Sequence, residues 1–392
     1  MLRRFLTAVG LAASAVWLPA DALDNWTYRS IGGKVVSVAY GHERFVAVGG
    51  YLNEPYIALS TNGSLWTQQP FAGVSGFIAV CFGDGKFVAL SGAGHVAVST
   101  NGTFWESSLL PDNVALAMTA ITHGGGRFVA VGSRQVSANP YDYRAVIYSS
   151  TNGVDWTNWM STAVSRANGV AYGNGKFVVV GGGYNTHWEH NIHLSTNGVD
   201  WTPQSSPVYQ HYAVAFGGGQ FVASTGARNF RTSADGETWA TQNFYAPNVF
   251  AASITYGNGT FVAVGSQDQF QHTVLRSEDG TNWQVRSFGP LYPNSFLTGV
   301  AFGADTFVAV GTPQNVLQSG DVRVPSLKVL SAGDPRQLRV AGKIQTPYRL
   351  QSSTDLNDWQ DVTHYTIQTP TAVLSIPATN TSSRLFFRAV SP

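Results

Sequence analysis

The sequence predicts an all-β protein built from repeats, and three observations lead to this fold class. Only 11% of the residues are charged while 42 are glycine, a composition that suits short strands joined by tight turns. Two aromatic markers recur about every 40 to 50 residues, a Phe that opens an apolar strand and a Trp that follows a turn. The Phe markers are Phe45, Phe87, Phe128, Phe177, Phe221, Phe261 and Phe307. Four-stranded antiparallel units with this period indicate a β-propeller, here with seven blades.

The first 22 residues are typical of a secretory signal peptide. Arg3 and Arg4 form a basic start, a short apolar run follows, and Ala20-Asp21-Ala22 has the pattern of a cleavage site. No later stretch is long and apolar enough to predict a membrane span. We therefore expect a secreted or periplasmic bacterial protein.

Each repeat is expected to contain four strands. The first ends in Gly, as in Val170–Gly173, and the second begins at the marker Phe. The third ends in Ser-Thr, and the fourth begins at the marker Trp. An Asn-Gly or Asp-Gly pair joins the third strand to the fourth in six repeats, and such pairs are typical of two-residue hairpin turns in which both residues have positive φ.

The two ends of the repeat array are complementary. Seven second strands are present, but only six complete fourth strands follow them, because the last repeat ends at Ser319-Gly320-Asp321 without a Trp. The missing strand is found before the first repeat, at Asn25-Trp26-Thr27. The sequence therefore predicts that the N-terminal segment completes the seventh blade and closes the ring without an open edge.

The repeated Ser-Thr-Asn-Gly-x-x-Trp resembles the Asp-box of bacterial neuraminidase repeats, over roughly residues 24–324. Four of the six copies have Asn where that family has Asp. In such propellers the box is structural, so the resemblance implies the fold and a role in hairpin and blade-edge packing. It implies very little about sialidase activity.

Residues 325–392 do not follow the repeat. Alternating runs such as Tyr348–Gln351 and Leu385–Arg388 predict a small β-sandwich after the propeller of residues 23–324. This segment resembles C-terminal modules of secreted proteins from environmental bacteria.

The charge balance limits the partners. The chain has 23 basic and 22 acidic residues, and removal of the signal peptide leaves 21 of each. A net charge of zero gives no bulk attraction to nucleic acid or anionic membranes, so neither is expected as a partner. We expect a monomer, with the single Cys81 in an apolar strand as a buried core residue.

Strand alternation separates two faces of the predicted propeller. The turns between first and second strands and between third and fourth strands lie at one face, and the longer, more varied loops lie at the other. Aromatic side chains in these loops suit stacking on the apolar faces of sugar rings, or else pack under the loops and between blades. The predicted ligand-binding residues are Tyr141, Tyr143, Trp159, Tyr184, Trp188, Tyr212 and Tyr245 with Arg166 and Arg228.

The same face carries candidate catalytic groups. Hydrolysis of a glycosidic bond normally needs two carboxylates, for which Glu54, Asp142, Glu189 and Asp268 are candidates. A polysaccharide lyase would instead need a base, and His187 and His190 lie in the densest polar cluster. His193 falls within a strand and is expected to pack between blades, so the histidines predict no metal site, and no cofactor is expected. Three functions stay open: glycan binding, glycoside hydrolase or lyase activity, and a protein-interaction scaffold.

Overall fold

The computed structural model describes residues 23, 25–51, 54–112, 114–137, 142–161, 166–182, 191–204, 210–226, 229–242, 249–267, 271–288, 296–312, 314–320, 326–331, 336–341, 347–354, 358–366, 371–376 and 386–390. The regular elements in these residues are β-strands, as predicted. The predicted signal peptide lies outside them. Within the described ranges, no helix is apolar and long enough to cross a membrane.

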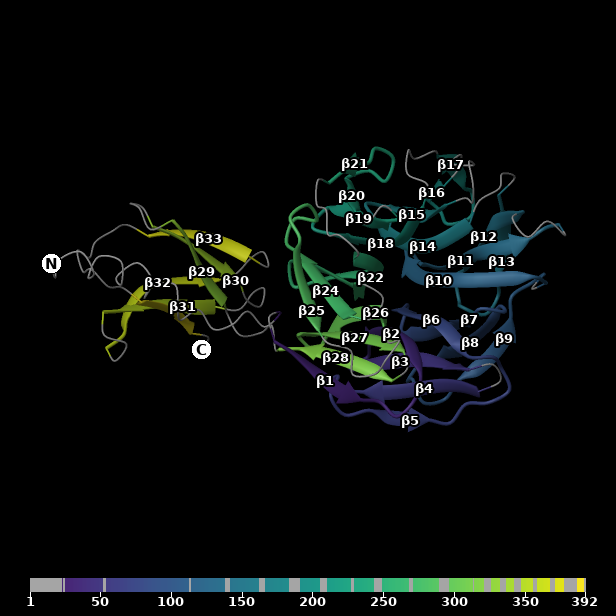
Figure 1. Cartoon of the computed structure of the whole chain (residues 1–392), viewed down its shortest axis with the longest axis horizontal. Helices are drawn as coiled ribbons and strands as arrows, with labels where there is room; N and C mark the ends of the chain where they lie inside the picture. Colours follow the sequence, from purple (N-terminus) through teal and green to yellow (C-terminus); the bar gives the residue numbers. More distant parts are fainter. Residues whose placement is uncertain are drawn as a thin grey trace. The chain divides into compact units, whose positions relative to one another are not determined.

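Residues Thr27–Gln318 form a compact unit in which seven four-stranded sheets are arranged around a central axis (Figure 1). The strands of each blade are given from the innermost outward. Blade 1 consists of β2 (Val35–Gly41), β3 (Arg44–Tyr51), β4 (Glu54–Ser60) and β5 (Thr67–Gln69), and blade 2 consists of β6 (Phe77–Gly83), β7 (Lys86–Ser91), β8 (His95–Ser99) and β9 (Glu106–Leu109). Blade 3 consists of β10 (Leu116–Gly124), β11 (Arg127–Gln135), β12 (Tyr143–Ser150) and β13 (Thr157–Met160), and blade 4 consists of β14 (Arg166–Gly173), β15 (Lys176–Gly182), β16 (Ile192–Ser195) and β17 (Thr202–Gln204). Blade 5 consists of β18 (His211–Gly217), β19 (Gln220–Thr225), β20 (Phe230–Ser233) and β21 (Ala240–Thr241), and blade 6 consists of β22 (Val249–Gly257), β23 (Thr260–Gln267), β24 (Gln271–Ser277) and β25 (Gln284–Phe288). Blade 7 consists of β26 (Phe296–Gly303), β27 (Thr306–Thr312), β28 (Asn315–Ser319) and β1 (Trp26–Ser30).

The N-terminal strand closes the ring, which confirms the prediction. β1 is the outermost strand of blade 7 and pairs with β28. Trp26 Nε1 donates a hydrogen bond to the carbonyl of Leu23 (2.9 Å), just as Trp66 Nε1 donates to the carbonyl of Gly63 (3.0 Å) in blade 1. Trp26 therefore takes the place of the marker Trp that the last repeat lacks.

The marker Phe residues explain why the second strands form the middle of each core. All seven are almost completely buried, and each burial is worth about 1.5–3 kcal/mol. The apolar clusters lie between neighbouring blades rather than within one. One cluster joins Val35 and Val38 of blade 1 to Val308 and Val310 of blade 7, so the first and last blades share a core.

A glycine packs against an aromatic ring between each pair of neighbouring inner strands. Each inner strand ends in a Gly that lies under the ring of the residue before the equivalent Gly in the next blade. A Cβ on any of these glycines would lie 2.0 to 2.2 Å from that ring. The pairs are Gly41–Phe82, Gly83–His123, Gly124–Tyr172, Gly173–Phe216, Gly217–Tyr256, Gly257–Phe302 and Gly303–Tyr40. The last pair returns to blade 1, so the contact runs around the whole ring.

The Asn-Gly pairs join the third strand to the antiparallel fourth strand, as predicted, but not as two-residue hairpin turns with two positive φ angles. Two consecutive residues with positive φ occur between first and second strands, as at Asp84 (46°) and Gly85 (69°). In the Asn-Gly pairs only the glycine has positive φ, for example Gly153 (79°), while Asn152 does not. The physical reason is that the Asn side chain itself organises the turn by accepting backbone hydrogen bonds.

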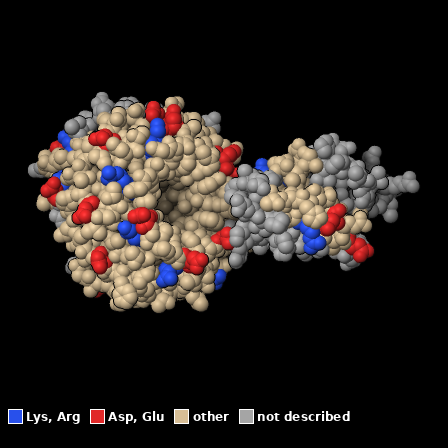
Figure 2. Space-filling view, turned by 180° about the vertical axis from the view of Figure 1, so that it is seen from behind, with Lys and Arg blue, Asp and Glu red and all other residues tan. Residues whose placement is uncertain are grey.

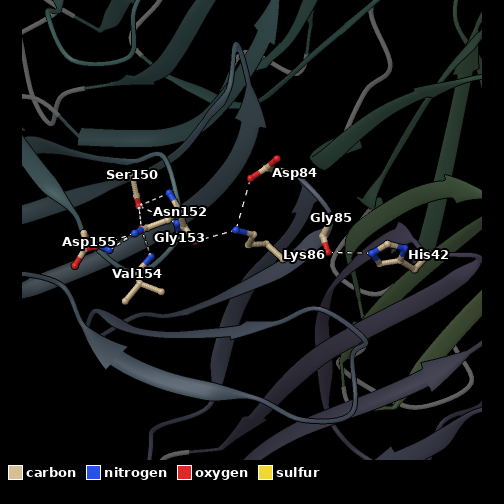
Figure 3. A network of polar contacts seen from close by, with 9 residues as sticks. All are labelled: His42, Asp84, Gly85, Lys86, Ser150, Asn152, Gly153, Val154 and Asp155. Carbon is tan, nitrogen blue, oxygen red and sulfur yellow. Dashed lines mark hydrogen bonds and ion pairs between the residues drawn. The ribbon is translucent and has the colours of Figure 1, made fainter.

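The turn at residues 150–156 shows this arrangement (Figure 3). The Ser150 hydroxyl accepts a hydrogen bond from the Gly153 amide (2.8 Å), and Asn152 Oδ1 accepts one from the Val154 amide (2.8 Å). Trp156 Nε1 then donates to the Gly153 carbonyl (3.0 Å), which fixes the ring at the blade edge. The repeated motif is therefore a hydrogen-bonded structural turn in this chain.

Side chains at the short-turn face link several blades to the next, as Figure 3 shows for blades 1 to 3. Lys86 Nζ donates to the carbonyl of Asn152 in blade 3 (3.4 Å) and forms an ion pair with Asp84 (3.6 Å), while His42 Nε2 of blade 1 donates to the carbonyl of Gly85 (2.9 Å). Equivalent contacts in other blades are Arg44 Nη1 to the Asn101 carbonyl (3.0 Å), Gln220 Nε2 to the Asp279 carbonyl (2.7 Å) and Gln318 Nε2 to the Asn62 carbonyl (2.6 Å). The polar side chains of this face thus serve the assembly of the ring.

The C-terminal part belongs to a second compact unit. It contains two three-stranded sheets, one of β29 (Ser326–Ser331), β30 (Arg336–Ala341) and β33 (Thr371–Ile376), the other of β32 (Gln360–Thr366), β31 (Pro347–Ser353) and β34 (Phe386–Val390). Leu338 and Val340 of the first sheet share one apolar cluster with Tyr348 and Leu350 of the second. The domain boundary at residue 324 stays a prediction.

Candidate ligand-binding site

Most of the predicted site residues lie outside the residues that the structure describes. They are Glu189, His187, His190 and Asp268 of the proposed catalytic set, and Tyr184, Trp188, Tyr141, Tyr245 and Arg228 of the proposed ligand-binding set. The described members are Glu54, Asp142, Tyr143, Trp159, Arg166 and Tyr212. The positions of these six residues show which of the predicted groups the structure brings together.

Each inner strand carries a register shift near its start. In β10 the shift falls between Met118 and Ala120, in β14 between Ala167 and Gly169, and in β26 between Leu297 and Gly299. The other four inner strands have a shift at the equivalent place. Such bulges leave residues unpaired and re-aim their side chains, here at the loop-face end of the innermost strands.

Polar residues at these bulges tie neighbouring blades together. Thr119 donates to the carbonyl of Ala167 (2.9 Å), Asn168 donates to the carbonyl of His211 (2.7 Å), and Thr298 of blade 7 donates to the carbonyl of Val36 in blade 1 (2.8 Å). These hydrogen bonds connect the inner-strand starts of blades 3, 4 and 5 and those of blades 7 and 1. They limit the movement of these strand starts relative to one another.

Three aromatic side chains project from the starts of consecutive inner strands, and we call them the aromatic arc. They are Tyr212 of blade 5, Phe250 of blade 6 and Phe296 of blade 7. The ring of Tyr212 meets that of Phe250 edge-on, with centroids 4.4 Å apart, and its hydroxyl donates to Gln210 Oε1 (3.1 Å). Phe250 and Phe296 are 38% and 45% exposed. The arc is thus a partly exposed apolar surface beside the channel.

The blade before this arc and the blade after it each carry a cation stacked on a tyrosine ring. In blade 4 the Arg166 guanidinium lies over the ring of Tyr143, 3.8 Å from its centroid. In blade 1 the Lys34 ammonium lies over the ring of Tyr51, at 4.8 Å. Stacking on an aromatic face is attractive to both cations and orients them. Sequence reasoning found Tyr212, Tyr143 and Arg166 but missed Phe250 and Lys34.

The described carboxylates of the predicted catalytic set are not brought together. Glu54 is exposed at the start of β4 in blade 1, where its backbone pairs with Tyr51. Asp142 precedes β12 in blade 3 and forms an ion pair with Arg144 (3.2 Å). The described starts of the inner strands carry no Asp or Glu. A two-carboxylate site is therefore not formed by the described residues.

Trp159 has a different placement from the one predicted. It lies in strand β13 rather than in a loop, and its ring packs edge-on against His193 of blade 4, with centroids 5.3 Å apart. Trp159 therefore packs between blades, which is the alternative to sugar stacking that the sequence left open. His193 is buried, as expected for its strand position. Across the described ranges, no group of His, Cys, Asp and Glu has the proximity that a metal ion needs.

Two further histidines are completely buried under the loop face. His272 of blade 6 lies between Tyr28 Oη (3.0 Å from Nδ1) and Asn315 Nδ2 (3.3 Å from Nε2). Asn315 Nδ2 also donates to the Thr312 carbonyl (2.9 Å), so Nε2 accepts and Nδ1 carries the proton toward Tyr28. A second proton on Nε2 of His272 would point at the side-chain amide of Asn315, which is itself a hydrogen-bond donor. Burial lowers the pKa of His272 to about 4, and burial together with the charge of Arg231 lowers the pKa of His211 to about 4.

These shifts predict a loss of stability in mild acid. Below the unfolded-state pKa of about 6.5, the unfolded chain takes up protons that the folded protein refuses until near pH 4, so stability falls as the pH falls through this window. Between pH 7 and pH 5, each histidine is expected to remove about 2 kcal/mol from the free energy of unfolding. Urea unfolding at a series of pH values measures the slope. Replacement of His272 by Asn should flatten it; an unchanged slope in H272N would contradict the assignment.

Comparison with known proteins agrees with this fold. No sequence-family model and no characterised protein matches the sequence. Among solved structures, the chain resembles YCF48 bound to D1 peptide, with a TM-score of 0.57 and 15% identity over 78% of this chain and 99% of that one. It also resembles virginiamycin B lyase from Staphylococcus aureus, with a TM-score of 0.60 and 12% identity over 76% and 99% of the two chains. A catalytically inactive form of that lyase with quinupristin gives a TM-score of 0.58 at 11% identity, over 76% of this chain and 99% of that one. At these identities the likeness is one of fold, that of the seven-bladed β-propeller.

Proposed function

We propose that the protein binds a glycan at the mouth of its channel, on the face that carries the long loops. The observation that supports this proposal most is the aromatic arc of Tyr212, Phe250 and Phe296. Sugar rings have apolar C–H faces surrounded by hydroxyls, and partly exposed aromatic rings beside polar groups complement both. Together with the predicted signal peptide, this makes a secreted or periplasmic carbohydrate-binding propeller the function that we favour.

Binding is favoured over catalysis by the charges near the arc. A glycoside hydrolase needs two carboxylates at a defined separation, and the described inner-strand starts provide none. Hydrolase or lyase activity would have to come from Glu189, Asp268, His187 or His190 in the loops. It is the alternative that an assay of reducing ends, or of absorbance from a new double bond, separates from simple binding.

A peptide ligand is the second candidate. One solved structure with the same fold carries a bound peptide, and two of the three arc residues are phenylalanines, which would also accept apolar side chains. In this case the protein would serve as an interaction scaffold. The two candidates differ in whether free oligosaccharides compete for the site.

The proposal predicts that loss of an arc residue weakens glycan binding and that loss of a still more exposed aromatic residue elsewhere does not. Tyr212→Ala and Phe250→Ala are each expected to weaken glycan binding about tenfold, the equivalent of about 1.4 kcal/mol for a lost stacking contact. Glycan-array screening followed by titration calorimetry on the best ligand measures this. Phe104→Ala is the control, because Phe104 is 81% exposed in a third-to-fourth-strand turn at the opposite face. If Phe104→Ala loses as much affinity as the arc variants, the proposed face is wrong.

A further inference from the structure

A side-chain amide, that of Gln210, lies beside the aromatic arc. Gln210 occupies the place in blade 5 that Phe250 and Phe296 occupy in blades 6 and 7, directly before the register shift of the inner strand. Tyr212 lies within the shift of blade 5. We infer that Gln210 determines which sugar the site accepts, by binding a hydroxyl at the edge of the ring that stacks on the arc; this inference rests on the proposed function.

The backbone of Gln210 is held at the junction of two blades. It forms a β-bridge with Gly182 of blade 4, and its carbonyl accepts a hydrogen bond from the amide of Gly226 in blade 5 (2.8 Å). A Cβ at Gly226 would lie 3.5 Å from Gln210 Cβ and 3.7 Å from Tyr212 Cε2. The side chains of Gln210 and Tyr212 therefore lie together against Gly226, and the amide stands next to the aromatic ring.

The hydrogen bonds of Gln210 leave the donors of its amide for a ligand. The Tyr212 hydroxyl donates to Gln210 Oε1 (3.1 Å), which uses the amide oxygen and orients the amide group. The amide nitrogen of a glutamine carries two N–H donors. Among the described residues, the Gln210 side chain has no hydrogen-bond partner besides Tyr212, and it is only half-buried. Its Nε2 group is thus a donor at the margin of the arc.

An amide beside an aromatic ring complements both parts of a sugar. A sugar stacked on Tyr212 or Phe250 presents its apolar face to the ring and its hydroxyls at the ring edge, where Nε2 can donate to a hydroxyl oxygen. A sugar without a hydroxyl at that edge would leave the donor without a partner, so it binds more weakly.

This selection uses no charged group, in keeping with a chain of which only 11% of the residues are charged. Figure 2 shows the same composition on one face of the molecule, where charged side chains lie scattered among uncharged residues around the central opening. A neutral donor such as the Gln210 amide therefore distinguishes sugars by their hydroxyl pattern, whatever their net charge.

The test uses four hexasaccharides that share β-1,4 linkages, namely cellohexaose, mannohexaose, xylohexaose and chitohexaose. Mannohexaose and chitohexaose differ from cellohexaose at C2, by an axial hydroxyl and an N-acetyl group, and xylohexaose lacks the hydroxymethyl group at C5. Both long edges of the sugar ring therefore vary within the series. The wild-type protein is expected to bind the best of the four about fivefold more tightly than the worst, measured by titration calorimetry.

Gln210→Met removes the donor and keeps the length of the side chain. It is expected to weaken binding of the best hexasaccharide about fivefold, the loss of one hydrogen bond between neutral groups, and to reduce the spread among the four to about twofold. Gln210→Glu should keep affinity and spread within about twofold, because its carboxylate accepts from Tyr212 and from a sugar hydroxyl. Gln69→Met is the control and should leave binding unchanged. Gln69 of blade 1 is also half-buried, and its amide donates to the carbonyls of Thr67 and Gln68.

The outcomes separate this inference from the proposed function. If Gln210→Met weakens all four sugars equally and keeps the spread, Gln210 only positions Tyr212, and its role in selection is wrong. If the wild-type protein binds all four equally, or Gln210→Met binds like the wild type, while Tyr212→Ala and Phe250→Ala lose affinity, the glycan site stands without selection by Gln210. If the wild-type protein binds none of the four, the inference fails, and the glycan proposal survives only if another glycan binds with the same dependence on the arc.

Discussion

Gly217→Ala is expected to lower the free energy of unfolding by about 3 kcal/mol or more, although it adds a single methyl group. The new Cβ would lie 2.0 Å from Cγ of Tyr256, in the next blade. Tyr256 cannot retreat easily, because its own ring packs against the buried Phe261 (centroids 4.7 Å apart). The two inner strands would have to separate, which also strains the adjoining blade contacts.

Gly92→Ala provides the matched control. The nearest atom to a Cβ at Gly92 is 3.9 Å away, an ordinary contact distance, and its backbone does not have positive φ. This variant is expected to change stability by no more than about 0.5 kcal/mol. Chemical denaturation of both variants, monitored by tryptophan fluorescence, gives the comparison. Equal stabilities of the Gly217→Ala and Gly92→Ala proteins would contradict the packing described for the inner ring.

Removal of residues 23–30 is expected to destabilise the propeller by about 3 kcal/mol or more and to promote aggregation. This segment contains β1, the outer strand of blade 7, and its loss leaves the edge of β28 unpaired. Side-chain contacts are lost too, including Arg29 Nε to Gln318 Oε1 (3.0 Å) and Tyr28 Oη to His272 Nδ1 (3.0 Å). Each hydrogen bond contributes about 1 kcal/mol, and an unpaired edge strand invites pairing with another molecule.

A chain that begins at residue 23 separates the effect of closure from that of simple shortening. It lacks only the predicted signal peptide and should keep the melting temperature and monomeric state of the full-length chain. Differential scanning calorimetry and size-exclusion chromatography compare the two truncations. If the shorter chain melts at the same temperature as its control, β1 contributes nothing to the ring.

The ring could be predicted from the sequence because its determinants recur. The second strand of every blade contains a buried Phe, and every inner strand ends in a Gly that lies under an aromatic ring of the next blade. These residues therefore appear in each repeat of the sequence, and Trp26 takes the place of the Trp that the last repeat lacks. The turn conformation was predicted wrongly because Asn-Gly has two uses. At Asn152 the side chain builds the turn, whereas at Asp84-Gly85 the backbone does so.

The site could be predicted only in part, because its residues do not recur. Tyr212 stands out as an aromatic residue near a strand start, but Phe250 resembles the many phenylalanines of the core. It lies just before the bulge between Ala251 and Ser253, a feature that no residue type predicts. Lys34 lies next to Tyr51 in space while 17 positions away in the chain, so its stacking could not be predicted without the pairing of β2 with β3. The prediction placed Trp159 in a loop, because the strand that contains it is short and its neighbours there are polar.

The most direct measurement for the glycan site is a crystal structure of the mature protein with a bound oligosaccharide from the array screen. The proposal predicts sugar rings over Tyr212, Phe250 and Phe296. Density for the sugar at the short-turn face, or on the C-terminal unit, with the aromatic arc left uncovered, would contradict it.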